Sequence, residues 1–239
     1  MKKLIKWIFV FFGVSLLLGA AGFAGMYIYF AADLPKISSL KDYQPPVITS
    51  VYAQGGEKIG EFCEQRRIIL PFEKIPKTLV NAFVASEDAR FYEHEGIDLH
   101  SIIRAFFKNL EAGRIVQGGS TITQQVAKSF FLTPERSYTR KIREAILAYR
   151  IDRHFSKEQI LYLYLNQIYL GHGAYGVEVA AQNYFGKSAE ELNIAESAML
   201  AGLPQAPSRY SPYKHPEYAK QRQIYVLLRM RQEDMLSRQ

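Results

Sequence analysis

The hydrophobic and polar positions divide the chain into a long apolar segment near the N-terminus and a periodic remainder. Residues 7–32 carry no charged side chain, and a helix of that length spans the roughly 30 Å hydrocarbon core of a bilayer. Lysines at positions 2, 3 and 6 precede it, so the positive-inside rule predicts a cytoplasmic N-terminus. A cleaved signal peptide is the alternative, because positions 19–21 are small. The apolar run continues well past them, which favours an uncleaved anchor with everything from Asp33 on outside the cytoplasmic membrane.

Beyond the anchor, the pattern predicts a stalk, a hairpin and then mostly helices. Prolines interrupt residues 33–46, and residues 47–62 alternate weakly around Gly55-Gly56, which predicts a short hairpin. The expected organisation is a tip and anchor at 1–32, a stalk with a hairpin at 33–70, and the main domain at 71–239.

Capping residues and apolar periodicity predict the helices of the main domain. No succession of βαβ units is seen, so the fold class is mainly α. One helix is expected to begin with Pro76 as its first residue, a second to run from an Asp98 cap to Gly113, and a third from Thr133-Pro134 to about Arg153. Two more are expected to begin at capping boxes: one at Ser156–Gln159, running to Leu170 before Gly171, and one at Ser188–Glu191, running to about Leu200. The last is expected over residues 222–235.

The charge balance of the chain indicates which kinds of partner it binds. The 30 basic and 23 acidic residues give a net charge of +7, which suits a membrane surface, phosphate or nucleic acid. An extracytoplasmic location counts against nucleic acid and indicates lipid head groups or lipid-linked phosphates instead. The one cysteine, Cys63, excludes an intrachain disulfide.

Two polar clusters carry the candidate chemistry. The first is EDARFYEHEG, from Glu87 to Gly96, and the second is QGGSTITQQ, residues 117–125. Paired glycines allow the backbone to approach a ligand closely. Together with hydroxyl and amide side chains, they predict a site for sugars or phosphates, with Ser120 as an N-cap in the alternative, purely structural interpretation.

Glu87 is the candidate general base. It falls near the C-terminal end of the helix that Pro76 begins, where the helix dipole disfavours an anion. This placement predicts a raised pKa for the carboxyl, which suits a general base. An exposed acid at a helix end is the alternative.

Arg140, Lys141 and Glu144 have spacings that place them on one helix face. One interpretation is an ordinary surface ion pair, worth about 0.3–0.5 kcal/mol. The other is a phosphate-binding face in which Glu144 orients the cations or holds a metal, with Lys128 and Arg136 as further members.

Other motifs have structural explanations. Asn166 and Tyr169 are expected to form a buried amide network at a helix end. Phe106-Phe107 and residues 130–132 are expected to pack in the core, with immersion in the membrane as the alternative. Three segments match known motifs but lack the context that each motif requires. GHGAYG, which begins at Gly171, matches a dinucleotide fingerprint, and His94-Glu95 begins like a zinc motif. Residues Ser38–Lys41 match an acyl-serine motif.

Five segments, in order, resemble the motifs of the peptidoglycan glycosyltransferase domain of class A penicillin-binding proteins, glycosyltransferase family 51. The resemblance covers the chain from about Pro46 to the C-terminus. It rests on EDARFYEHEG from Glu87, GGSTITQQ from Gly118, RKIRE from Arg140, ILYLYLNQIYLG from Ile160 and AMLAGLPQAP from Ala198.

The resemblance implies a lysozyme-like, mainly helical fold with a membrane-proximal jaw, and polymerisation of lipid II into glycan strands. It implies catalytic roles for Glu87 and Glu144. No cofactor is required by the sequence, although family members use a divalent metal such as Mg²⁺ or Mn²⁺, for which Glu144 or Glu87 would be the ligand. The residues implied to bind substrate are Asp88, His94, Ser120, Thr121, Gln124, Gln125, Lys128, Arg136, Arg140 and Lys141.

The implied partners are lipid II, the growing lipid-linked strand and the membrane, without nucleic acid. Two-domain family members continue into a transpeptidase, to which the helix from about residue 222 would lead. Two alternatives remain: a lysozyme-like enzyme that cleaves glycan with the same two carboxylates, and an anchored, non-catalytic scaffold for cell-wall synthesis. The basic face at Arg140 argues against the first, and the intact acids argue against the second.

Overall fold

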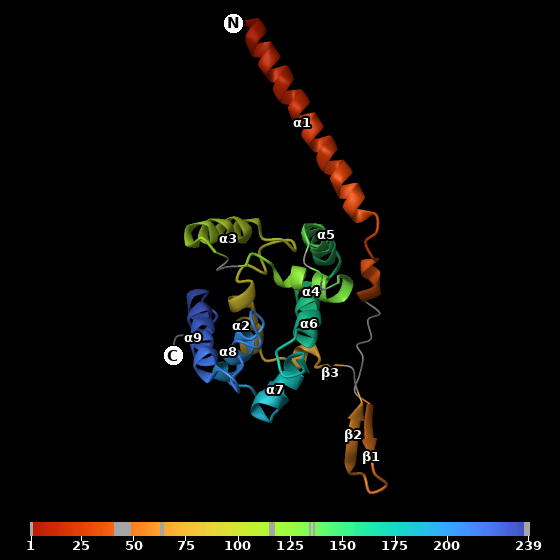
Figure 1. The fold of residues 1–239 in the computed structure, drawn as a ribbon, viewed down its shortest axis with the longest axis vertical. Coiled ribbons are helices and arrows are strands. Elements are labelled where there is room, and N and C mark those ends of the chain that lie inside the picture. Colours follow the sequence, from red (N-terminus) through yellow and green to blue (C-terminus); the bar gives the residue numbers. More distant parts are fainter. Residues whose placement is uncertain are drawn as a thin grey trace.

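A computed structural model describes residues 2–40, 49–62, 65–114, 118–133, 135 and 137–236. Of the residues singled out in the sequence, Lys41, Pro46, Cys63, Pro134 and Arg136 lie outside the described residues. The described part is mainly helical, as predicted, with a long N-terminal helix projecting from a body of packed helices (Figure 1).

The projecting helix α1, Lys2–Ala31, is the predicted anchor. In the described part of the chain it is the one helix that is long and apolar enough to cross a membrane, over Ile5–Ala31 with a mean hydropathy of 2.1. Its C-terminal end contacts the body, because Tyr27 Oη accepts a hydrogen bond of 3.0 Å from Nη2 of Arg150.

The predicted hairpin is confirmed. Strands β1, Thr49–Tyr52, and β2, Lys58–Phe62, pair antiparallel, and Gly56 in the turn has a φ of +84°. The hairpin lies at the end of the molecule opposite α1 (Figure 1). A second small sheet, in which β3 (Arg66–Arg67) pairs parallel with β4 (Ala174–Tyr175), was not predicted.

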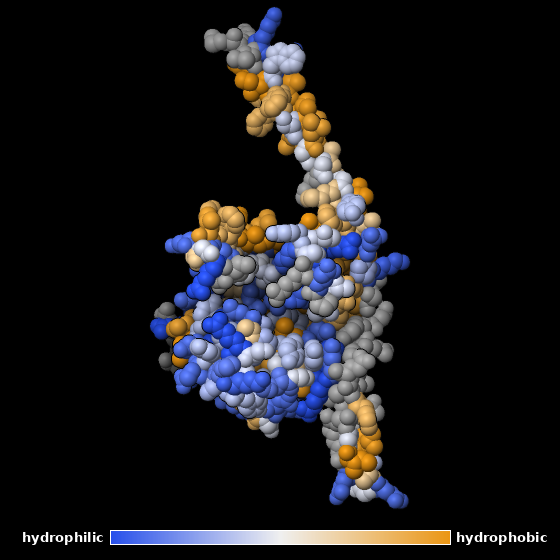
Figure 2. Space-filling view, viewed as in Figure 1, coloured by the Kyte–Doolittle hydropathy of each residue, from blue (hydrophilic) through white to orange (hydrophobic). Residues whose placement is uncertain are grey.

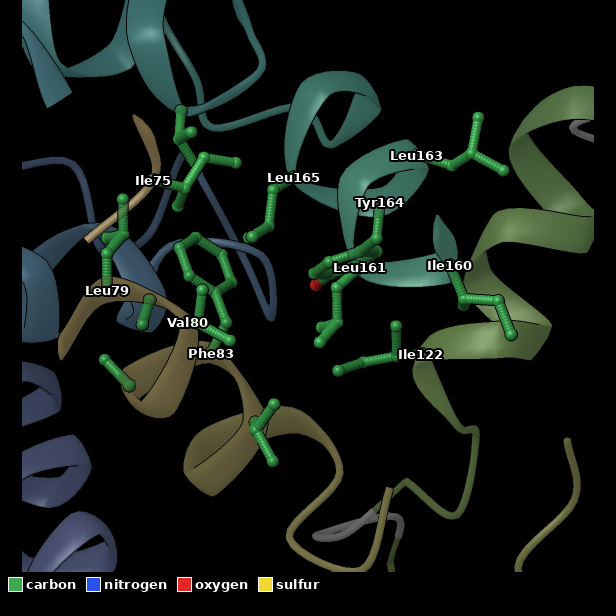
Figure 3. Packing of buried hydrophobic residues seen from close by; sticks show 14 of the residues in the cluster. Ile75, Leu79, Val80, Phe83, Ile122, Ile160, Leu161, Leu163, Tyr164 and Leu165 are labelled. Carbon is green, nitrogen blue, oxygen red and sulfur yellow. The ribbon is translucent and has the colours of Figure 1, made fainter. Parts of the chain in front are cut away.

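The core forms where α2, Lys77–Glu87, α4, Ile122–Phe131, and α6, Lys157–Gln167, meet. Figure 3 shows side chains of all three helices converging. Phe83 and Tyr164 pack edge to face with 5.9 Å between ring centroids, and Ile122 and Leu161 are fully buried. This core fixes the end of α2 relative to the start of α4.

The remaining helices surround this core. α8, Ile194–Gly202, and α9, Pro216–Gln232, pack on each other and on α2, while α5, Tyr138–His154, packs on α4 and α1. The other elements are α3 (Leu99–Ala112), α7 (Val177–Phe185), and the short 3₁₀ helices η1 (Ile37–Leu40), η2 (Phe72–Lys74) and η3 (Ala189–Glu191).

Helix boundaries were predicted correctly where a local cap decides them. The Asp98 side chain accepts a hydrogen bond from the Ser101 amide, and Gly113 ends α3 with a φ of +62°. The capping box of Ser156 and Gln159 is present at the start of α6. Pro76 is the N-cap residue of α2 rather than its first helical residue.

Other boundaries were predicted wrongly. α5 begins after a Ser137 cap rather than at Thr133. α6 ends at Gln167, because the Leu170 amide bonds to the Ala174 carbonyl and no longer to the helix. The Ser188 cap starts only η3, and α8 begins after a separate capping box at Asn193. α9 begins at Pro216, six residues before the predicted start.

The apolar face of α3 is exposed, so the expectation of core packing is wrong there. Ile103, Phe106 and Phe107 are 57, 63 and 62% exposed. These side chains gather on the side of the body from which α1 extends (Figure 2). Phe130, Phe131 and Leu132 are instead partly buried against the core.

Candidate active site

A cleft of about 680 Å³ lies between α3, α4 with the loop before it, the end of α2 and α9. The end of α2 and the polar loop before α4 form its wall together with side chains of α3 and α9. The lining residues are Ala85, Ser86, Glu87, Asp88, Ala89, Asp98, Ser101, Arg104, Lys108, Gly118, Gly119, Ser120, Thr121, Gln125, Lys128, Gln205, Arg222, Tyr225, Arg229 and Gln232. A space of this size is typical of a ligand site, and its many polar and charged lining residues suit a polar ligand.

Glu87 is the last residue of α2, and its side chain is 13% exposed in the cleft wall. Gln125 Nε2 donates a hydrogen bond of 3.0 Å to its Oε2. Burial raises the pKa of the Glu87 carboxyl, while the Gln125 hydrogen bond and the charges of Arg222 and Lys128 oppose that shift. The predicted direction of the pKa shift is therefore confirmed, but desolvation rather than the helix dipole is its largest cause.

Asp88 ties the end of α2 to the start of α4. Its Oδ2 accepts a hydrogen bond of 2.9 Å from the Ile122 amide, where the positive end of the helix dipole favours a carboxylate. His94 Nε2 lies 3.0 Å from Asp88 Oδ1, and both side chains are buried. The contacts made by Asp88 and His94 within the protein thus fix the position of the neighbouring Glu87.

The N-cap of α4 is Thr121, so the alternative interpretation, in which Ser120 is the cap, is wrong. Thr121 Oγ1 accepts a hydrogen bond from the backbone amide of Gln124, and the side-chain oxygen of Gln124 accepts one from the backbone amide of Thr121. Thr121 also donates a hydrogen bond of 2.6 Å to the Gly96 carbonyl. Thr121 and Gln124 are both buried. Their side chains therefore make the capping box, and their predicted contact with substrate stays a prediction.

Glu144 is buried at 3% exposure between two cations of its own helix. Arg140 Nη1 donates a hydrogen bond of 3.0 Å to its Oε2, and Lys141 Nζ contacts its Oε1. This burial contradicts the interpretation as an ordinary surface ion pair. Lys141 Nζ also donates a hydrogen bond of 2.8 Å to Ser120 Oγ, and Ser120 lines the cleft. The basic face of α5 is thereby joined to the polar loop.

The structure does not test the divalent metal for which the resemblance offered Glu144 or Glu87 as a ligand. Such an ion needs several oxygen ligands, and the described residues hold no group of three His, Cys, Asp or Glu that would supply them. Both carboxylate oxygens of Glu144 are already engaged by cations. We therefore derive no step of the reaction through a metal.

Several residues of the cleft were missed by the sequence interpretation. Arg222 and Arg229 lie on α9, and Arg104 and Lys108 lie on α3, all lining the cleft. The spacing of Arg222 and Arg229 by seven residues puts them on one helix face, which is the signal that was available in the sequence. Their proximity to Glu87 depends on how α9 packs, which no local pattern contains.

Asn166 and Tyr169, from the motif ILYLYLNQIYLG, were both expected to belong to a buried amide network, and only one of them does. The Asn166 amide is buried and bonds to both the amide and the carbonyl of Leu70, as expected for a buried network. Tyr169 is 42% exposed and is not part of that network. In the GHGAYG segment, Ala174–Tyr175 is strand β4, so the geometry of a dinucleotide fingerprint is not formed.

Comparison with known proteins identifies relatives of the whole chain. A penicillin-binding protein 1A of Rickettsia conorii is 48% identical over 229 residues, which is 94% of this chain and 29% of the relative. A penicillin-binding protein 1A of Aquifex aeolicus is 50% identical over 218 residues, 90% of this chain and 30% of the relative. The chain thus spans less than a third of the length of these relatives.

A solved structure and a family model complete the comparison. A 2.6 Å crystal structure of penicillin-binding protein 1A from Haemophilus influenzae matches with 28% identity and a TM-score of 0.45, covering 82% of this chain and 20% of that one. The model of the transglycosylase family matches residues 55–231, which include the basic face of α5, the polar loop and Glu87. The chain belongs to the transglycosylase family.

Proposed function

We propose that this chain is the glycosyltransferase part of a membrane-anchored enzyme that polymerises lipid II into β-1,4-linked glycan strands. The configuration at the donor carbon inverts, and undecaprenyl diphosphate is released. The observation that carries the proposal is the mostly buried Glu87 carboxylate at the wall of the cleft, held by Gln125 through one oxygen. Family membership supports the same reaction class.

Glu87 acts as the general base. Its Oε2 accepts the Gln125 hydrogen bond, while Oε1 lies 3.9 Å from Arg222 Nη2, beyond hydrogen-bond distance. Oε1 is therefore the oxygen that takes the proton from the 4-hydroxyl of the acceptor GlcNAc. The hydroxyl oxygen bonds to C1 of the donor MurNAc as the C1–O bond to the diphosphate breaks. A pKa raised by burial makes the carboxylate a stronger base for this transfer.

The diphosphate leaving group carries negative charge that the basic side chains neutralise. Lys128 lines the cleft, and Lys141 reaches it through Ser120. Glu144 has the supporting role of orienting Arg140 and Lys141, because it is buried between them. Positive charges that are already in place lower the barrier more than charges that must be gathered during the reaction.

The membrane supplies the lipid substrate. Helix α1 crosses it once with its N-terminus in the cytoplasm, and the cleft lies on the extracytoplasmic side, as the lysines before α1 indicate. The exposed apolar face of α3 lies on the side from which α1 extends, and it enters the bilayer interface (Figure 2). The greater length of the relatives supports a further, C-terminal domain, for which we propose a transpeptidase.

The test is incubation of the detergent-solubilised protein with labelled lipid II, with and without moenomycin. We expect long, lipid-linked glycan that moenomycin suppresses. Soluble muropeptides released from purified sacculi would instead identify a glycan-cleaving enzyme. Binding of lipid II without turnover under any detergent or metal condition would identify a scaffold.

A further inference from the structure

Arg222 stands next to the proposed base without a role in the mechanism above. Its Nη2 lies 3.9 Å from Glu87 Oε1, and the two side chains are 12 and 13% exposed. At that separation, with both side chains mostly buried, the pair interacts through charge rather than through a hydrogen bond. Arg222 comes from α9, which lies outside all five sequence motifs.

The guanidinium of Arg222 is held from several sides. Its Nε lies 3.3 Å from the carbonyl oxygen of Gly202, to which it donates. The guanidinium carbon is 4.4 Å from the ring centroid of Tyr225 and 5.7 Å from that of Tyr210. A cation fixed by a carbonyl and two aromatic faces loses little freedom when it interacts with a further anion.

Gly202 explains part of the fifth motif, AMLAGLPQAP, which the mechanism leaves without a function. A Cβ at Gly202 would come within 2.8 Å of Arg222 Cγ. Cγ is near the base of the side chain, so this overlap moves the whole guanidinium. The preceding carbonyl, of Ala201, accepts a hydrogen bond of 3.1 Å from Ser86 Oγ, the residue before Glu87. The end of α8 thus contacts Ser86, the residue before the proposed base, on one side and Arg222 on the other.

We propose that Arg222 is a positioning residue of the transfer reaction. Held by the Gly202 carbonyl and the Tyr225 ring, it places a fixed positive charge beside Oε1 of Glu87. It thereby links the last helix, α9, to catalysis. This role rests on the proposed function of Glu87 as the base. Other charged groups near Glu87 are Lys128 on α4 and Asp88 at the end of α2, and the phenol of Tyr164 lies on α6. Arg222 and Lys128 are the cations of this set.

The first test is the dependence of lipid II turnover on pH in Arg222→Met and Arg222→Lys. Loss of the cation raises the pKa of Glu87, so the acid limb of kcat moves to higher pH by about one unit, and kcat recovers as the pH rises. Arg222→Lys keeps the charge and restores most of the acid limb. A profile of Arg222→Met that coincides with that of the wild type would overturn the proposal. A pH-independent rise in KM would overturn it too, because it would identify a substrate contact.

Gly202→Ala and Arg209→Met are the matched controls. Gly202→Ala displaces Arg222 without removing its charge, so the acid limb should move in the same direction as in Arg222→Met. Arg209 also stacks on Tyr210, with its guanidinium carbon 5.8 Å from the ring centroid, but it does not line the cleft. Arg209→Met should leave the acid limb in place. A shift as large as that of Arg222→Met would attribute the effect to Tyr210 packing and contradict the proposal.

A second readout needs no turnover. Melting temperatures of the wild type, Glu87→Gln, Arg222→Met and the double variant form a cycle that measures the coupling of the two side chains. The rise in melting temperature caused by Glu87→Gln should be larger in the Arg222→Met background, because the buried Glu87 carboxylate there lacks the Arg222 cation. Additive shifts would overturn the proposed contact. If the wild type makes no glycan but the cycle shows coupling, the proposed function fails and the Arg222–Glu87 link stands.

Discussion

Gln125 Nε2 lies 3.0 Å from Oε2 of Glu87, so the first turn of α4 holds the last residue of α2. The two residues are 38 positions apart in the chain. They come from two different polar clusters of the sequence, and the core between α2, α4 and α6 brings them together (Figure 3). This contact engages one carboxylate oxygen of Glu87, and the residue lines the cleft.

Replacing Gln125 with Leu should slow polymerisation about tenfold or more and shift its acid limb to higher pH. The Gln125 hydrogen bond lowers the pKa of Glu87, so its loss raises that pKa further and leaves the carboxylate free to turn. The measurement is the rate of glycan formation from pH 5 to 9, a range of about four units that spans the useful pKa of a base. A Gln125→Leu enzyme with wild-type rates would remove this contact from the mechanism.

Glu87→Gln should stabilise the fold near neutral pH. Burial raises the pKa of Glu87 above its ordinary value of 4.5, so the native state holds the proton more tightly than the unfolded state. The stability that this group contributes is present below that value and is lost as the pH rises through the native pKa. The melting temperature of Glu87→Gln should therefore exceed that of the wild type at neutral pH, and the difference should shrink on acidification. An equal difference at every pH would contradict the direction of the shift.

Glu144→Gln should lower both stability and turnover. The buried carboxylate accepts hydrogen bonds from Arg140 and Lys141, and losing charged hydrogen bonds of this kind costs about 1–3 kcal/mol. Urea denaturation measures the free energy of unfolding. Arg153 pairs with Glu95 at 4.0 Å on the surface, with side chains 59 and 71% exposed, so Glu95→Gln is the control and should change stability little. Near-normal turnover in Glu144→Gln would remove Glu144 from the mechanism.

Gly96→Ala should destabilise the protein by about 3 kcal/mol or more. Gly96 has a φ of +79°, and a Cβ there would overlap the Ala148 carbonyl. Because its own carbonyl accepts the Thr121 hydrogen bond, the strain reaches the start of α4. Gly118 offers a control for stability, since a Cβ at that position meets nothing within 4 Å. Equal unfolding free energies of the two alanine variants would show that the Gly96 backbone relaxes freely.

Membrane contact of α3 can be measured with tryptophan fluorescence. The chain has one tryptophan, Trp7, in α1. A Trp7→Phe, Phe106→Trp variant in vesicles with brominated lipids should be strongly quenched, since Phe106 belongs to the exposed apolar face. Tyr213 is 60% exposed and lies outside α3, so a Trp7→Phe, Tyr213→Trp variant is the control and should remain unquenched. Equal fluorescence of the two variants would place α3 in water.

The sequence predicted most of the helices, because these depend on local patterns. The roles of Glu87 as the base and of the basic face on α5 stay predictions. Asp98 with Gly113 and Ser156 with Gln159 define their helix ends through contacts within one turn. The predicted end of α6 was wrong because the backbone amide of Leu170 donates a hydrogen bond to the Ala174 carbonyl across a tight turn. Arg222 was missed for a related reason, since its position beside Glu87 depends on the packing of α9 against α2 and α8.

The most direct test of the central claim is the rate of lipid II polymerisation by purified Glu87→Gln, compared with the wild type in the same detergent. Glycan formation should fall by about 100-fold or more, while circular dichroism and the melting curve show a folded protein. A folded Glu87→Gln variant that polymerises lipid II at a rate close to that of the wild type would contradict the assignment of Glu87 as the base.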